Sequence, residues 1–261
     1  MKEHPEVIEK ADYLLNQLSR FTSEGSRPFV ECATFPDEIR YVGWAYTFPW
    51  HFIDTPFFDE GFYTDVHPEN QNVTWLISEL VDSLEDATMV WDSSIPSVSP
   101  LFGESFNIRF LVHFVGDIHQ PLHAVSRYTA DYPNGDAGGN YFPVEFAEDI
   151  KNLHSLWDSG VGQYKMNFSL PMDEKTWAQN GYYAKEIEDL FPMDSFDDLD
   201  KPYTEWHLES FDLAKEFVYK YIEDGSKPTE FYIEEGTRLV QRQIAKGGYR
   251  LAKLFIDMWG E

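Results

Sequence analysis

The chain has 261 residues, 43% of them hydrophobic and 17% aromatic, which is enough for one large domain core or two small ones. Its formal net charge of −26 excludes a generic nucleic-acid binder that gains its affinity by neutralising phosphates with basic side chains. Cys32 is the only cysteine, so an intramolecular disulfide is excluded, and no apolar run reaches the roughly 20 residues that span a bilayer.

Helical periodicity dominates the chain. Residues 5–22 and 69–86 each place their aliphatic side chains on one stripe, as expected of a surface helix with one buried face. Residues 103–120 are apolar on most faces, which predicts a buried central helix that ends near Pro121. Four further helices are predicted over 148–160, 174–190, 204–224 and 229–258.

Little of the sequence favours strands. The segment NYFPVEF at 140–146 is the best strand candidate, and it is short. Residues 24–68 and 124–147 are predicted to be long functional loops. Neither an internal repeat nor a Gly/Ser linker divides the chain. We therefore expect a single all-α, multi-helix domain over 1–261, with at most a short hairpin.

One spacing occurs twice, as His113-x-x-x-Asp117 and as His154-x-x-x-Asp158. Residues four apart lie on the same face of a helix, so each pair can direct an imidazole and a carboxylate at one point. A buried imidazole beside a buried carboxylate is costly without partners, and a metal ion satisfies both groups. Imidazole and carboxylate ligands without thiolates suit zinc. The pairs therefore predict a polynuclear zinc hydrolase site.

His123, which follows the break at Pro121, completes a second group with His154 and Asp158. Three protein ligands and one open position are typical of catalytic zinc. The first pair needs further ligands, for which Asp37 and His51 are the best upstream candidates. An exposed Asp37 and a His51 packed among aromatic rings are an equally good interpretation of those two residues. In so acidic a protein, bound metal ions would be the local positive charge that captures a polyanion.

Five motifs extend this pattern to a known family. In order and rough spacing, the chain resembles the zinc-dependent single-strand nucleases of fungi, and more closely the nuclease/3′-nucleotidases of protozoa. Bacterial zinc phospholipase C shares their all-α fold. The motifs are WHFIDTP (50–56), FLVHFVGDIHQPLH (110–123), DAGGN (136–140), NLHSLWDS (152–159) and QIAKGGYRLA (243–252).

The resemblance implies three zinc ions in one cleft. Asp37, His51, His113 and Asp117 match the ligands of the first zinc, and Asp117 would also bridge to the third. The ligands of the second zinc are matched by His123, His154 and Asp158.

The resemblance also assigns substrate contacts. Arg40 matches an arginine that contacts the scissile phosphate, while Phe52 and Asp54 match a pair that stacks on the base and hydrogen-bonds it. Asn140 matches a residue that lines the cleft. The expected reaction is hydrolysis of single-stranded DNA or RNA, or of 3′-nucleotides, by a zinc-bound hydroxide held near Asp117.

The N-terminus departs from the family. There the third zinc is held by an N-terminal Trp and a nearby His, neither of which has a counterpart here, and His4 does not match. We therefore expect two complete zinc sites. Either the sequence as given lacks the N-terminal segment of the family domain, or the protein works with fewer metals. A zinc-binding but inactive protein and a phospholipase C-like enzyme are the alternatives.

The resemblance further implies a secreted or lysosomal protein, although the first residues, MKEHPEVIEK, contain no signal peptide. Two triplets that begin at Asn72 and Asn167 are candidate N-glycosylation sites. We expect a monomer.

Overall fold

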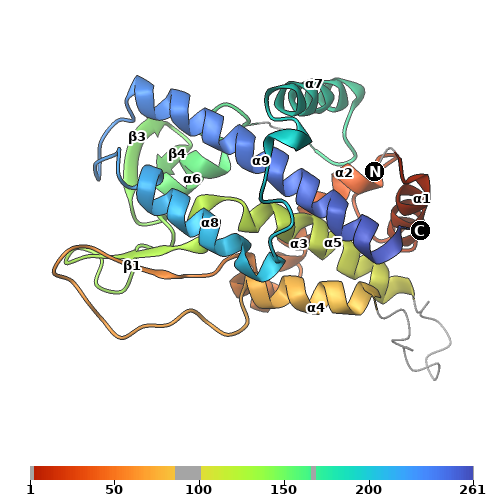
Figure 1. Cartoon of the computed structure of the whole chain (residues 1–261), viewed down its shortest axis with the longest axis horizontal. Coiled ribbons are helices and arrows are strands. Elements are labelled where there is room, and N and C mark those ends of the chain that lie inside the picture. The colour runs from red at the N-terminus through yellow and green to blue at the C-terminus, as the bar shows by residue number, and fades with distance from the viewer. Residues whose placement is uncertain (1–2, 86–100, 166–168, 261) are drawn as a thin grey trace.

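The computed structural model describes residues 3–85, 101–165 and 169–260. Its regular structure is mostly helical (Figure 1), so the predicted all-α class is confirmed. The helices are α1 (Pro5–Asn16), α2 (Pro28–Glu31), α3 (Phe35–Arg40), α4 (Val73–Glu85), α5 (Leu101–Ile118), α6 (Leu153–Asp158), α7 (Glu174–Leu190), α8 (Trp206–Leu213) and α9 (Glu230–Trp259). Shorter helical segments lie at Cys32–Thr34, Ala45–His51, Pro121–Ala124, Met193–Ser195, Tyr203–Glu205 and Ala214–Val218.

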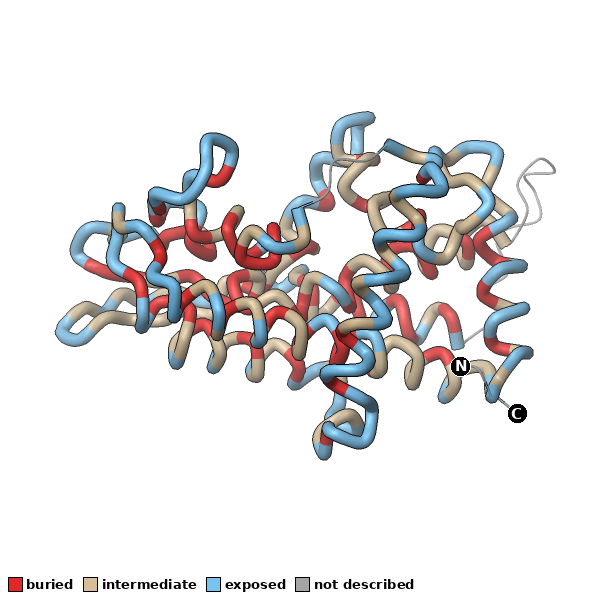
Figure 2. The backbone as a smooth tube through the Cα atoms, turned by 90° about the horizontal axis from the view of Figure 1, so that it is seen from above, coloured by how far each residue is buried: buried red, intermediate tan, exposed pale blue. Residues whose placement is uncertain are grey.

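α5 is the buried central helix that its apolar sequence predicted. Ile108, Phe110 and Phe114 on this helix are almost completely buried, and they pack in one cluster with side chains of α1, α4 and the end of α9. The burial colours of Figure 2 show the buried positions gathered where helices face one another. The end of α5 that carries Asp117 is therefore fixed from several sides.

α9 crosses the molecule diagonally in Figure 1 and joins two cores. Phe255, near its C-terminal end, belongs to the cluster around α5, whereas Tyr232 and Val240 belong to a second cluster with α6 and the nearby strands. One continuous helix thus contributes side chains to both clusters and connects them. None of the described helices combines the length and the apolar character needed to cross a membrane.

Two small sheets lie beside the helices. β3 (Pro143–Ala147) and β4 (Ile150–Asn152) form an antiparallel hairpin, which agrees with the strand predicted over 140–146. β1 (Pro56–Phe58) and β2 (Ser126–Tyr128) form a parallel pair that the sequence did not predict. Strands of three residues are too short to show alternation. This pair fastens the chain just after His51 to the chain just after His123.

Several predicted boundaries were wrong. The segment 24–68 is not one loop, since it contains α2, α3 and β1 as well as helical turns. Pro28 and Pro36 occupy the first turns of α2 and α3, where proline costs no hydrogen bond. The helix predicted over 5–22 ends at Asn16, because the Ser19 hydroxyl donates to the Asn16 carbonyl and favours a turn.

The helix predicted over 148–160 is also shorter than expected. Its first residues form β4, and α6 begins only at Leu153. Asn152 caps α6 by accepting from the Ser155 N–H, and the Ser155 hydroxyl lies 3.4 Å from the Asn152 N–H in return. Asn72 similarly accepts from N–H groups at the start of α4, while the second glycosylation triplet begins at Asn167, outside the described residues.

Candidate metal centre

A cleft of about 940 Å³ opens at the C-terminal end of α5. Its walls come from α3, the turn Ala45–His51, α5, the loop after Pro121, α6 and the middle of α9. All of the site residues predicted from the sequence line it: Asp37, Arg40, His51, Phe52, Asp54, His113, Asp117, His123, Asn140, His154 and Asp158. Segments that are far apart in the sequence therefore meet in one cavity.

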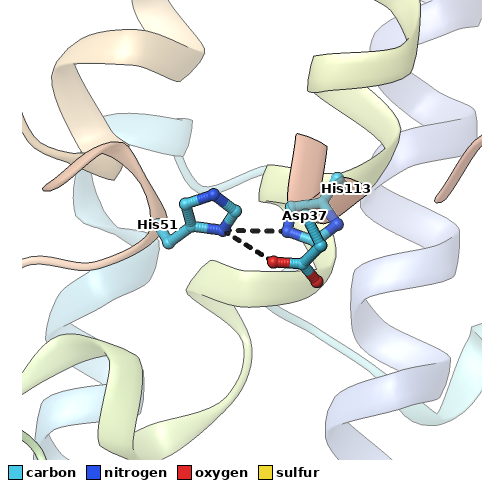
Figure 3. Close-up of side chains that lie close together, drawn as sticks. All are labelled: Asp37, His51 and His113. Atoms are coloured by element: carbon cyan, nitrogen blue, oxygen red, sulfur yellow. Dashed lines mark hydrogen bonds and ion pairs between the residues drawn. The ribbon is translucent and has the colours of Figure 1, made fainter. Parts of the chain in front are cut away.

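The first group consists of Asp37, His51 and His113, one from each of three segments (Figure 3). Their candidate ligand atoms all lie within 4.8 Å of one another. His51 Nδ1 is 3.0 Å from His113 Nε2 and 3.9 Å from a carboxylate oxygen of Asp37. This is the spacing of donor atoms that could surround one cation.

Both interpretations of the upstream pair describe part of this geometry. The Asp37 side chain is 47% exposed, and the buried His51 ring meets the Phe114 ring edge-on at 4.9 Å. An exposed acid and an aromatic-packed imidazole are thus both present. Their donor atoms nevertheless converge on His113, which ordinary surface and core residues have no reason to do.

The second group consists of His123, His154 and Asp158, whose candidate ligand atoms also lie within 4.8 Å of one another. The Nε2 atoms of both histidines are 3.4 Å from carboxylate oxygens of Asp158. The two imidazole rings stack with their centroids 4.9 Å apart. Both Nε2 atoms therefore face the same carboxylate, as ligands of one cation would.

Asp117 lies between the two groups. One of its oxygens is 3.0 Å from His51 Nδ1 and 3.1 Å from His113 Nε2, and the other is 3.6 Å from His123 Nδ1. A carboxylate has two oxygens with several lone pairs, so one side chain can serve two neighbouring cations. The two groups are therefore parts of one centre.

Backbone carbonyl groups orient three of the four histidines. The Nδ1 atoms of His113, His123 and His154 lie 2.5 Å, 2.9 Å and 2.8 Å from the carbonyl oxygens of Ala33, His51 and Gly138. In a neutral imidazole, an Nδ1–H that donates to a carbonyl leaves Nε2 without a proton, which is the form that binds a metal. Such orienting contacts are typical of metal-binding histidines.

Local geometry explains how the chain delivers these side chains. His113 and Asp117 lie one turn apart on α5, and His154 and Asp158 lie one turn apart on α6, as the spacing predicted. The Gly138 carbonyl that receives His154 belongs to a loop held by Asp136. This fully buried carboxylate accepts from the N–H of Arg127 and from the hydroxyl of Tyr219.

The electrostatics of the site favour bound cations. Burial acts to raise the pKa of Asp117, but His113 and His123 outweigh it and hold that pKa well below the usual range. Burial acts to lower the pKa of His123, and Asp117 and Asp158 instead raise it to about 9. His123 thus holds a proton among carboxylates, in a place that a metal cation could take.

Burial lowers the pKa of both His51 and His154, which keeps these imidazoles neutral and ready to bind a metal. Burial also raises the pKa of Asp54 to about 6, with a contribution from the nearby Asp136 carboxylate and an opposing one from His123. The Asp54 carboxyl group can therefore donate as well as accept a hydrogen bond near neutral pH.

The predicted substrate contacts lie around the two groups. Arg40 donates from Nη2 to Asp37 at 2.5 Å, and its guanidinium carbon lies 5.5 Å from the centre of the Phe48 ring. The Phe52 ring meets Phe48 edge-on at 5.3 Å. Asn140 is exposed and donates to the Ala137 carbonyl in the loop beside His154.

The sequence did not single out Gln120 or Phe48, which both line the cleft. Gln120 donates to Asp158 at 2.8 Å and accepts from the N–H of Leu122, and its position just before Pro121 in a histidine-rich stretch was the available signal. Phe48 lines the cleft, but nothing in the sequence separates it from a core aromatic residue.

His119 was left out of the predicted ligands, and the structure commits both of its ring nitrogens elsewhere. Its Nδ1 lies 2.7 Å from the Val115 carbonyl, and its Nε2 lies 3.0 Å from Nη1 of Arg250. Burial lowers its pKa to about 3, so the imidazole is neutral.

Comparisons with known proteins agree with this arrangement. The family described as S1/P1 Nuclease matches residues 4–259. The chain is 28% identical to Endonuclease 4 of Arabidopsis thaliana, covering 84% of this chain and 73% of that protein. It is 27% identical to Nuclease P1 of Penicillium citrinum, covering 91% of this chain and 87% of that protein. Nuclease S1 of Aspergillus oryzae is 26% identical over 84% of this chain and 75% of its own length.

Proposed function

Because the chain belongs to the S1/P1 nuclease family and is thus a nuclease, we propose that it is a zinc-dependent phosphodiesterase of single-stranded DNA and RNA. We propose that it releases 5′-nucleotides and also acts as a 3′-nucleotidase. The observation that carries the proposal is the convergence of four histidines and three aspartates on one cleft. We further propose that residues 1–261 act as one domain.

The donor atoms fit zinc. Four imidazoles and three carboxylates without a thiolate form two adjacent groups, and carbonyl contacts leave the Nε2 atoms of three imidazoles available. The first zinc would be held by Asp37, His51, His113 and Asp117, and the second by His123, His154 and Asp158. Bound zinc would acidify water and neutralise charge on the phosphate.

The other cleft residues have separate roles in binding the substrate. Arg40 lines the cleft and pairs with Asp37 through Nη2, one nitrogen of a guanidinium that carries five N–H donors. Its guanidinium therefore keeps donors for phosphate oxygens. Phe52 stacks on a base, which requires that the base be unpaired and so favours single strands. Asp54 would hydrogen-bond the edge of that base, and Asn140 would line the cleft beside it.

The test compares zinc-loaded protein with chelator-treated protein on five substrates. These are single-stranded DNA, the matching duplex, RNA, a 3′-mononucleotide and phosphatidylcholine. We expect zinc-dependent hydrolysis of the single strands and of the 3′-mononucleotide, and slower hydrolysis of the duplex. Equal cleavage of the duplex would contradict the role of Phe52. Hydrolysis of the lipid alone would favour the phospholipase alternative, and zinc binding without any turnover would favour an inactive protein.

The family resemblance also supports a secreted or lysosomal location and a monomeric protein. Imaging the tagged gene product in its own cells tests the location. Light scattering of the purified protein tests the oligomeric state, and a mass of about one chain of 30.5 kDa is expected.

A further inference from the structure

A group of exposed aromatic side chains lies beside the cleft. We call Trp44, Tyr46 and Phe48 the aromatic ledge, and their side chains are 38%, 60% and 54% exposed. Tyr41, three residues before Trp44, is also exposed, at 85%. Isolated exposed aromatics are ordinary, but several on one short segment mark an interaction surface.

Contacts with neighbouring aromatic rings fix Trp44 and Tyr46 in place. Trp44 and Tyr46 stack with their centroids 5.5 Å apart, and Trp44 also packs on Phe106 of α5 at 5.1 Å. Tyr46 meets Trp50 edge-on at 5.8 Å. Rings that are already fixed lose little conformational entropy when a flat ligand stacks on them.

The aromatic ledge borders the cleft through Phe48. Phe48 lines the cleft and meets the Phe52 ring edge-on, and the guanidinium carbon of Arg40 lies 5.5 Å from the centre of the Phe48 ring. Trp44 and Tyr46 belong to the same turn of chain, Ala45–His51 and the residue before it. A ligand that leaves the cleft past Phe48 therefore meets further aromatic surface within one helical turn.

The charge of this segment also differs from that of the chain. The protein has 46 acidic residues, yet residues 39–53 contain none, and the basic side chains among them are Arg40 and His51. Elsewhere the surface repels polyanions. Residues 39–53 therefore place no carboxylate of their own beside a phosphate backbone that lies on the aromatic ledge.

We propose that the aromatic ledge binds the unpaired bases of a nucleic-acid strand that extends beyond the nucleotide at the scissile phosphate. This rests on the proposed function. Stacking on aromatic rings tolerates any base, because every base has a π-face, so the ledge would add affinity for length rather than for sequence. It would make long single strands better substrates than dinucleotides.

The experiment compares Tyr46→Ala and Tyr46→Phe with wild type on a dinucleotide and on a single strand about ten nucleotides long. Tyr46→Ala should raise KM for the long strand about fivefold or more, leave its kcat unchanged and leave both constants for the dinucleotide unchanged. Tyr46→Phe keeps the ring and should behave as wild type. Tyr13→Ala on α1, where the tyrosine is 52% exposed, is the matched control and should change nothing.

A binding measurement without chemistry separates this inference from the proposed function. Fluorescence anisotropy of a labelled single strand with non-hydrolysable backbone linkages, measured on zinc-loaded protein, should show about fivefold or more weaker binding by Tyr46→Ala. Should wild type hydrolyse no nucleic acid, the proposed function is wrong, and this measurement still decides the ledge. Hydrolysis by wild type with equal binding by Tyr46→Ala overturns the ledge alone.

Two other occupants give different results. If vesicles of phosphatidylcholine bind wild type but not Tyr46→Ala, while strand binding is equal, the ledge is a membrane contact and the inference is wrong. The same holds if light scattering shows a dimer of wild type that Tyr46→Ala dissociates. Loss of strand binding, with the mass unchanged and no vesicle binding, supports the inference.

Discussion

Asp117 is the residue on which the centre depends, since its two oxygens face both ligand groups. Asp117→Asn keeps the shape but removes the negative charge. We expect zinc content to fall by at least one ion per chain and hydrolysis to fall about a thousandfold or more. Metal analysis by mass spectrometry and a single-strand assay measure the two effects. Asp65→Asn, at an aspartate whose side chain is 85% exposed, is the control, and full activity of Asp117→Asn would contradict the assignment.

Phe52 is expected to act on the substrate and not on the metals. Its ring packs on Phe48, and Phe52 belongs to neither group of candidate ligands among the described residues. Phe52→Ala should raise KM for single strands about fivefold or more and relax base preference, with kcat changed little. Zinc content should stay at the wild-type value. A loss of zinc in this variant would assign Phe52 to the support of the metal site instead.

For individual residues, the sequence predicts those side-chain positions that the geometry of a single helix determines. The two His-x-x-x-Asp pairs follow from the helical repeat alone, and the structure places each pair on one helix face. Asp37 and His51 reach His113 only through tertiary packing, so spacing left them open and the family resemblance was needed. The carbonyl contacts that orient the histidines involve Ala33 and Gly138, whose identities reveal nothing of that role.

The loop that supports His154 depends on one glycine. Gly138 has φ +61°, and a Cβ there would overlap the carbonyl oxygen of Leu122. Gly138→Ala should destabilise the protein by about 2 kcal/mol or more and displace the carbonyl that receives His154 Nδ1. Loss of an orienting partner typically weakens metal affinity about tenfold to a hundredfold.

Calorimetric zinc titration and urea unfolding measure both effects of Gly138→Ala. Gly225→Ala is the matched control, because Gly225 has a similar φ of +72° but open space around the Cβ position. It should cost about 1 kcal/mol of stability and leave zinc affinity unchanged. Equal zinc affinity in both variants would show that the loop does not position His154.

Among the elements, the long periodic ones were predictable and the short ones were not. The predicted helices 174–190 and 229–258 match α7 and α9 closely, and Asp173 and Thr229 cap them. α2, α3 and β1 are too short for a periodic signal, and tertiary contacts decide their conformation. Several walls of the cleft are such short elements, so the periodicity of the sequence could not predict which segments line it.

For the whole molecule, an ion-pair network behind the cleft joins α8, α9 and the end of α5. Glu209 accepts from Lys246 at 3.1 Å and from Arg250 at 2.9 Å and 3.0 Å, and Arg250 also contacts His119. Burial acts to raise the pKa of Glu209, but hydrogen bonds from Arg250 and Lys201 outweigh it and lower the pKa to about 2 from an ordinary 4.5. The network is thus linked to the stability of the fold.

Because the folded pKa is depressed, the contribution of Glu209 is present above the unfolded pKa near 4.5 and is lost as the pH falls through about 2. In chelator, Glu209→Gln should reduce the free energy of unfolding by about 2 kcal/mol at pH 7 and by less than half of that near pH 3. Urea unfolding at both pH values measures this. Glu60→Gln, at an exposed glutamate, is the control, and an equal deficit at both pH values would contradict the linkage.

The acidic surface and the proposed metal centre together determine where a nucleic-acid substrate would bind. A net charge of −26 repels nucleic acid over most of the surface, so capture has to be local. The proposed cations lie in a cleft whose neighbouring segment, residues 39–53, lacks acids. Composition alone predicted the need for such a site, whereas its place required the fold.

Anomalous X-ray diffraction from crystals soaked in zinc would show directly whether the histidines and aspartates of the cleft bind zinc. We expect one peak within coordinating distance of Asp37, His51, His113 and Asp117, and a second among His123, His154 and Asp158. Zinc bound only at other acidic positions on the surface, with no density at either group, would contradict it.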